Sequence, residues 1–263
     1  MKTHIILSIG LLFLCCFFAC KKDDESPCAL GSCTIQKPPG TYDYPIKPGT
    51  PQWAFFSSQQ EKLDAVQIPQ SVLQGMTTQA LLQTCMDCPV LVDIPLNIGA
   101  NVPGITHYYM TNFSGLIALS KRNDAGLVML SRYQAINPAC IVCRDNDLEK
   151  GEFSLGLSTF EVIFGHDSII RTLSLSQKKE TVRESLRKYE IKDSMLVSGY
   201  YTEYELATCV YLMSKIMMAE GYPPFMQLYS PDPHVQLFVQ KLSLPFDKKM
   251  FQDIMKIAIQ FCT

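Results

Sequence analysis

The sequence predicts an all-α fold, a multi-helix domain that follows an N-terminal signal and a proline-rich tether. Three observations lead to this prediction. Apolar residues recur at helical spacing over most of the chain after Trp53, helix-capping patterns precede several of these runs, and few segments alternate with a period of two. Because the connections are short and rich in Gly and Pro, we expect antiparallel helix pairs, arranged as one bundle or as a short curved stack.

The chain is expected to have three parts, a signal at 1–19, a tether at 20–52 and a helical domain at 53–263. Residues 26–52 contain six prolines and three glycines. Proline fixes φ and removes a backbone donor, so neither regular helix nor a central strand is expected there. We therefore interpret this stretch as a spacer.

In the first half of the domain, capping residues mark the expected helix starts. Ser58 and Glu61 have the spacing of a capping box. Thr77 or Thr78 can cap the next helix, which Pro89 would end. Apolar spacing then predicts helices over 105–121 and 124–136.

The helical signals of the second half are stronger. Residues 176–190 place apolar side chains on one stripe of an otherwise polar helix. Thr202 opens a second capping box before a long apolar-periodic run, and 247–262 repeats the pattern. The short apolar segments 90–94 and 141–143 are the best strand candidates.

The N-terminus has the composition of a signal peptide. Lys2 supplies a positive start, and residues 5–20 are almost purely apolar. Sixteen residues of helix span about 24 Å, which is short of the roughly 30 Å hydrocarbon core of a bilayer. A cleaved signal is therefore expected rather than a membrane-spanning helix.

The end of this run, Phe17-Phe18-Ala19-Cys20, resembles a bacterial lipoprotein signal. The resemblance implies that Cys20 is lipidated and becomes the first residue of the mature chain, with several acyl chains such as palmitate giving stable attachment. The alternative is a plain cleaved signal without a lipid.

The residues after Cys20 resemble the export tag of Bacteroidetes surface lipoproteins, and residues 77–133 resemble uncharacterised helical domains of such proteins. This resemblance implies an outer-membrane protein that is lipid-anchored and faces the cell exterior. The alternative is a solvated charge run at the head of the tether. The tag residues are Lys21, Lys22, Asp23, Asp24 and Glu25.

Eight cysteines remain after the signal and the lipidated residue, and an even number in an exported chain favours disulfides. Spacing suggests local pairs, 28 with 33, 85 with 88, 140 with 143, and 209 with 262. Zinc binding by the two CxxC pairs, free buried thiols and a redox role stay open as alternatives. The eight residues are Cys28, Cys33, Cys85, Cys88, Cys140, Cys143, Cys209 and Cys262.

No catalytic residue, metal site or cofactor is predicted. His107, His166 and His234 form no HExxH pattern, and the sequence has no GxSxG elbow or P-loop. The string from Gly151 to Gly156 lacks the lysine and the spacing of a phosphate loop, and the carboxylates at 145–149 lack the spacing of an EF-hand. The net charge of −2 gives no pull toward nucleic acid.

These observations predict a non-enzymatic, surface-anchored helical module that binds a protein or glycan partner. An enzyme with a dispersed active site and a structural component of an outer-membrane complex are the alternatives. Ser168 and Ser194 stand in Asp-Ser-apolar triplets that resemble Bacteroidetes O-glycosylation sites. Helix capping by the preceding Asp explains the same triplets without a sugar.

Overall fold

The structure, a computed structural model, describes residue 28 and residues 33–96, 101–243 and 247–263. In these residues it contains helices and turns but no β-strand, which confirms the all-α prediction. The elements are α1 Pro51–Ala54, α2 Gln59–Ala65, α3 Gln70–Gly75, α4 Thr78–Met86, η1 Pro89–Val92, α5 Asp93–Leu96, α6 Val102–Asn112, α7 Ser114–Ser120, α8 Ala125–Ala135, η2 Pro138–Cys143, α9 Asp147–Phe164, α10 Asp167–Ile170, α11 Leu175–Ser194, α12 Glu203–Ala219, α13 Pro223–Tyr229, α14 Pro233–Lys241 and α15 Lys248–Cys262.

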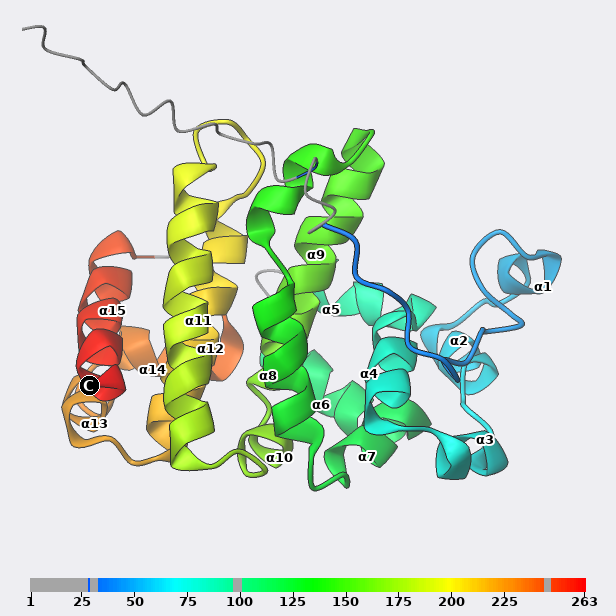
Figure 1. Cartoon of the computed structure of the whole chain (residues 1–263), viewed down its shortest axis with the longest axis horizontal. Helices are drawn as coiled ribbons and strands as arrows, with labels where there is room; N and C mark the ends of the chain where they lie inside the picture. The colour runs from blue at the N-terminus through cyan, green and yellow to red at the C-terminus, as the bar shows by residue number, and fades with distance from the viewer. Residues whose placement is uncertain (1–27, 29–32, 97–100, 244–246) are drawn as a thin grey trace, which may run out of the picture.

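The helices form a layered bundle in which α11 and α12 stand side by side as an antiparallel pair (Figure 1). Helix α9 packs on α12, and α15 packs on both α11 and α12. Helices α1 to α4 lie at the other end of the molecule, and α5 and α6 pack on α9 near its middle. A single apolar core runs through both ends.

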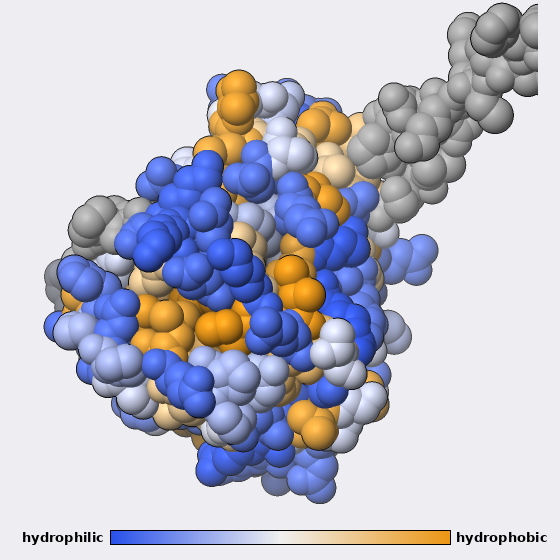
Figure 2. All heavy atoms as spheres, turned by 90° about the vertical axis from the view of Figure 1, so that its left-hand side faces the viewer, coloured by the Kyte–Doolittle hydropathy of each residue, from blue (hydrophilic) through white to orange (hydrophobic). Residues whose placement is uncertain are grey.

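Helix α15 closes the C-terminal end of the bundle with an amphipathic surface, as its sequence pattern predicted. Phe251, Ile254 and Phe261 lie on the face of α15 that is buried against the bundle. Figure 2 shows this end of the molecule, where apolar side chains form a band between hydrophilic ones. Ile259 of α15 is 57% exposed there.

The predicted capping boxes at Ser58 and Thr202 are both present. The predicted helix over 105–121 is instead two helices, α6 and α7. Phe113 interrupts them with an extended backbone and a fully buried ring, so tertiary packing overrides the helical periodicity at this residue.

The two strand candidates were wrong. Residues 90–94 belong to η1 and α5, and residues 141–143 belong to η2. Pro89 and Pro138 occupy the first turn of these 3-10 helices, where a missing backbone donor does no harm. Asn137 also caps η2, since its Oδ1 accepts a hydrogen bond from the amide of Ala139 at 3.1 Å.

Helix α9 was not predicted, although it lies at the centre of the fold. Its start is marked by Asn146, whose Oδ1 accepts a hydrogen bond from the amide of Glu149 at 3.0 Å. Glu149 in turn accepts one from the amide of Asp145 at 3.2 Å. The acidic segment at 145–149 is therefore a helix start, and Gly151 and Gly156 lie inside a helix rather than in a loop.

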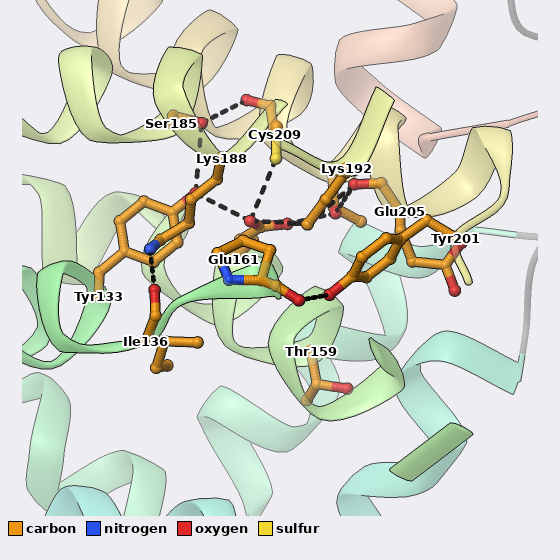
Figure 3. A network of polar contacts seen from close by, with 12 residues as sticks. Tyr133, Ile136, Thr159, Glu161, Ser185, Lys188, Lys192, Tyr201, Glu205 and Cys209 are labelled. Carbon is orange, nitrogen blue, oxygen red and sulfur yellow. Dashed lines mark hydrogen bonds and ion pairs between the residues drawn. The ribbon is translucent and has the colours of Figure 1, made fainter. Parts of the chain in front are cut away.

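A fully buried carboxylate on α9 connects the central helices (Figure 3). Glu161 accepts two hydrogen bonds of 2.9 Å from Lys192 of α11. It also accepts one from the hydroxyl of Tyr133 at 2.8 Å, and others from Thr208 and Cys209 of α12. Every partner is itself buried, so the charge of Glu161 is balanced and hydrogen-bonded away from water.

The surroundings of Lys192 favour its charged form. Burial opposes the charge of Lys192, but Cys209 and Glu161 beside it raise the pKa of the ammonium above its ordinary value. Burial and the nearby Glu161 raise the pKa of the Cys209 thiol to about 12. Cys209 is therefore a protonated hydrogen-bond donor and does not have the low pKa of a reactive cysteine.

The cysteine pairing differs from the local pairing that spacing suggested. Cys28 is bonded to Cys143 and Cys33 to Cys140, with Cα–Cα distances of 5.5 and 5.3 Å. The predicted 28–33, 140–143, 85–88 and 209–262 pairs were wrong, because the helical domain brings two distant segments together. Among the residues that the structure describes, four cysteines are free thiols, Cys85, Cys88, Cys209 and Cys262.

The proline-rich stretch packs on the domain from residue 33 onward, and we call residues 33–50 the strap. Tyr44 is buried and donates a hydrogen bond to the carbonyl of Thr84 at 3.0 Å, while the amide of Tyr42 donates to the Thr84 hydroxyl at 2.9 Å. Lys37 forms a 2.9 Å ion pair with Asp87. The strap is thus a docked part of the fold, whereas a spacer was expected.

We predict that Glu161→Leu lowers the free energy of unfolding by about 3–5 kcal/mol, because it leaves the buried ammonium of Lys192 without a counter-charge. Adding Lys192→Met should recover part of that loss. Chemical denaturation of the single and double variants measures both effects.

The matched control is Asp253→Ala on α15, which removes an exposed ion pair with Lys256 and should change stability by less than about 1 kcal/mol. A Glu161→Leu effect no larger than that of the control would contradict the role given to the cluster.

Candidate functional site

Two neighbouring cavities lie under and beside the strap. The first is about 370 Å³ and lies between the strap, α4, α8, η2 and α9. The second is about 400 Å³ and lies between the strap, α4 and α8. Both are lined by Ile35, Gln83, Met86, Arg132 and Ala135. We call the first cavity the arginine pocket and the pair together the strap groove.

The strap, together with Cys28 before it in the chain, is fixed at three places near the arginine pocket. The Cys33–Cys140 disulfide joins the first residue of the strap to η2. The Cys28–Cys143 disulfide joins a residue five positions earlier in the chain to the same 3-10 helix. Farther along, the ion pair between Lys37 and Asp87 holds the strap to the end of α4. The wall formed by the strap is therefore covalently attached to the wall formed by η2.

The position of η2 is in turn set by the buried core. Lys188 donates a hydrogen bond to the carbonyl of Ile136, just before η2, and Tyr201 donates one to the carbonyl of Pro138 at 2.7 Å. Both contacts are visible in Figure 3 beside the Glu161 cluster. The pocket wall that carries Cys140 thus rests on one buried and one partly buried polar contact.

Two guanidinium groups face the arginine pocket without a carboxylate partner. Among the described residues, neither Arg132 nor Arg144 forms an ion pair. Arg132 donates one hydrogen bond to Gln83 at 2.8 Å, and burial lowers its pKa below the ordinary value. Arg144 lies 4.9 Å from the ring centre of Phe153, and its Nε is buried with no hydrogen-bond partner.

The wall formed by α9 is open at Gly156. A methyl group at this position would meet no atom within 4 Å, and the residue is exposed. Glycine inside a helix costs roughly 1 kcal/mol relative to alanine. Gly156 therefore leaves space in the pocket at a position where a larger residue would be better for the helix.

Two histidines that are distant in the sequence meet elsewhere on the surface. His107 Nδ1 and His166 Nε2 are 3.3 Å apart, and their rings stack with centres separated by 5.6 Å. His166 Nδ1 caps α10, accepting from the amide of Ser168 at 3.3 Å and lying 2.8 Å from its hydroxyl. Neither histidine lines the strap groove.

A third cavity, of about 400 Å³, lies between α2, α5 and α6. The Tyr109 hydroxyl donates a 2.7 Å hydrogen bond to Asp93 at its edge. Gln59, Asn101 and Tyr108 are the other polar residues of its lining. Its described lining residues include no cation, so its chemistry differs from that of the arginine pocket.

The other predicted site residues are dispersed. Ser168 is half-buried beside His166, whereas Ser194 is exposed at the end of α11 and donates to the carbonyl of Ile191 at 2.7 Å. Burial raises the pKa of the Cys85 thiol, and it raises that of Cys88 to about 12. Cys20 and the tag residues Lys21, Lys22, Asp23, Asp24 and Glu25 lie outside the described residues.

Comparisons of the chain with protein-family models, curated proteins and solved structures gave no match. Within the described part of the chain, no helix has both the length and the apolar character needed to cross a bilayer. The same residues contain no cluster of three or more His, Cys, Asp or Glu side chains arranged to hold a metal ion.

The histidine pair predicts a pH-dependent stability. Burial, together with His107, Lys215 and Arg171, lowers the pKa of His166, while Asp167 opposes the shift. A lowered folded-state pKa means that the neutral form is favoured by folding. The resulting stabilisation is complete above the unfolded pKa of about 6.5 and is lost as the pH falls through the folded value.

Denaturation between pH 8 and pH 5.5 should therefore show a steeper loss of stability in the wild type than in His166→Asn, in which asparagine can still cap α10. His234→Asn, at an exposed position, is the control and should keep the wild-type slope. Equal slopes in all three proteins would count against the assignment.

Proposed function

We propose that this protein is a lipid-anchored lipoprotein on the outer face of a Bacteroidetes outer membrane, and that it binds a partner in the strap groove. The observation that carries the proposal is the arginine pocket. It combines unpaired cationic groups with open space, and it lies where disulfides fix the chain that leads to Cys20.

The sequence distance between the anchor and the domain supports a position close to the membrane. Cys28 is covalently joined to Cys143, and only eight residue steps separate it from Cys20. An extended chain of that length spans about 29 Å at most. The strap groove would therefore lie near the outer surface, within reach of soluble or surface-displayed molecules.

The lining of the groove supports binding rather than chemical conversion. Its cysteines, Cys33 and Cys140, are in a disulfide, and its described residues include no histidine. Nucleophilic catalysis needs a nucleophile within hydrogen-bond distance of a base, which these residues do not provide. The unpaired arginines instead offer directed hydrogen-bond donors to an anionic group.

We expect Gly156→Trp to block the groove and to reduce partner capture at least about tenfold, because the indole would occupy open space in the pocket. The measurement is chemical crosslinking on intact cells followed by quantification of the captured partner. Gly151→Trp is the matched control. It lies in the same helix and also has open space around its Cα, but it does not line either cavity. Equal capture by both variants would exclude the groove as the binding site.

Anchoring and orientation are tested separately. Cys20→Ser should release the protein from the membrane fraction, whereas alanine at Asp23, Asp24 and Glu25 should keep it in the membrane but shield it from external protease. Membrane fractionation measures the first effect, and protease treatment of intact cells, with cells opened by detergent as the reference, measures the second. Protection of the wild-type domain in intact cells would contradict surface exposure.

A further inference from the structure

We propose that the arginine pocket recognises a sugar-sized, hydroxylated carboxylate, with Arg132 and Arg144 binding the carboxylate and neighbouring acceptors binding the hydroxyl groups. The inference rests on the proposed function and names the ligand chemistry of the same groove. It follows from the charges, the acceptors and the size of the pocket.

The first argument is the unmet hydrogen-bonding capacity of the arginines. Leaving a buried donor without an acceptor destabilises the fold by about 1–3 kcal/mol, and by more when the group is charged. Arg144 Nε is such a donor, and no described carboxylate lies within ion-pair distance of Arg144 or Arg132. Of the other four arginines, Arg183 and Arg187 pair with Glu180 and Glu184, whereas Arg122 and Arg171 donate hydrogen bonds to backbone carbonyls.

A guanidinium matches a carboxylate with two parallel hydrogen bonds, a geometry that a neutral hydroxyl cannot supply. The ring of Phe153 lies against Arg144 and restricts how the guanidinium can turn. The donors are thus partly oriented before a ligand arrives, which lowers the entropy lost on binding.

The second argument is the balance of charge. The pocket lining contributes two arginines against two carboxylates, Asp87 and Glu152, and Asp87 is already paired with Lys37. Counting Lys37, three positive charges face two negative ones, an excess of one. One negative group on the ligand restores neutrality, whereas a ligand with several phosphates would meet the two carboxylates unfavourably.

The third argument is the mixture of acceptors and apolar surface. Glu152, Gln83 and Asn137 offer oxygen atoms to ligand hydroxyls, and Met86, Ile136 and Leu157 offer apolar surface to C–H groups. The cavity of about 370 Å³ is near the lower end of ligand pockets. It therefore suits one or two sugar rings better than a folded protein surface.

The experiment uses the full lipoprotein in detergent and isothermal titration calorimetry with three probes: glucuronate, digalacturonate, and the neutral disaccharide galactobiose. We expect both acidic probes to bind and galactobiose to bind at least tenfold more weakly. Tighter binding of digalacturonate than of glucuronate would point to a uronic acid chain as the source. The reverse order would point to a free sugar acid.

Arg144→Gln and Arg132→Gln should each weaken binding of the acidic probe at least tenfold, and Arg144→Lys should lie between because it keeps the charge but loses the planar fork. Arg171→Gln, directly after α10 and outside the groove, is the matched control and should bind like the wild type. Unfolding midpoints close to that of the wild type confirm that each variant is folded.

Several results would overturn the inference. These are equal binding of galactobiose, wild-type affinity in both glutamine variants, or equally tight binding of inorganic phosphate or of an acidic peptide such as triglutamate. If Gly156→Trp still abolishes partner capture while no uronate binds, only the ligand class falls. If Gly156→Trp has no effect on capture, the groove itself is wrong.

Discussion

The buried carboxylate of Glu161 is the constraint on which the arrangement of the central helices depends. A charge that is fully removed from water must be matched by a cation and by hydrogen-bond donors, or it destabilises the fold. Here α8, α11 and α12 each contribute a partner through Tyr133, Lys192 and Thr208. A shift of one of these helices along its axis would leave the charge unsatisfied. The cluster therefore fixes the register of helices whose apolar surfaces alone would tolerate several packings.

The same polar core determines the shape of the strap groove. Lys188 and Tyr201 extend the buried contacts to the two backbone carbonyls around the start of η2. Because η2 carries Cys140 and Cys143, its position decides where both disulfides hold the N-terminal segment. The pocket wall formed by the strap is thus connected to the core through η2. A groove held in this way would change little if a ligand entered, which favours selectivity over adaptability.

The sequence predicted the parts of the fold that depend on local interactions. The start of α12 and the whole of α15 follow from a capping residue and one apolar stripe. Helix α9 escaped prediction because it is buried around most of its second half, so it lacks a polar face, and because two glycines interrupt its first half. The partners of Glu161 are 28 to 48 residues away, and the disulfides join residues 107 and 115 positions apart. No local spacing encodes such contacts. Likewise, no sequence pattern indicates that Arg132 and Arg144 line one pocket with the strap.

One face of helix α9 is buried in the core, and another face lines the groove. Ser154, Ser158 and Glu161 follow one another at helical spacing on the buried side, whereas Glu152, Phe153 and Gly156 line the arginine pocket. An isolated helix with glycines at 151 and 156 would be weak, since each costs roughly 1 kcal/mol relative to alanine. The contacts of Glu161 and the packing of Phe160 and Phe164 on Tyr133 hold the helix in place independently of its propensity. The contacts on the buried face of α9 thus stabilise the helix enough for its other face to carry a glycine that leaves space in the pocket. This division explains why a residue unfavourable to the helix is compatible with the fold at the wall of the proposed binding site.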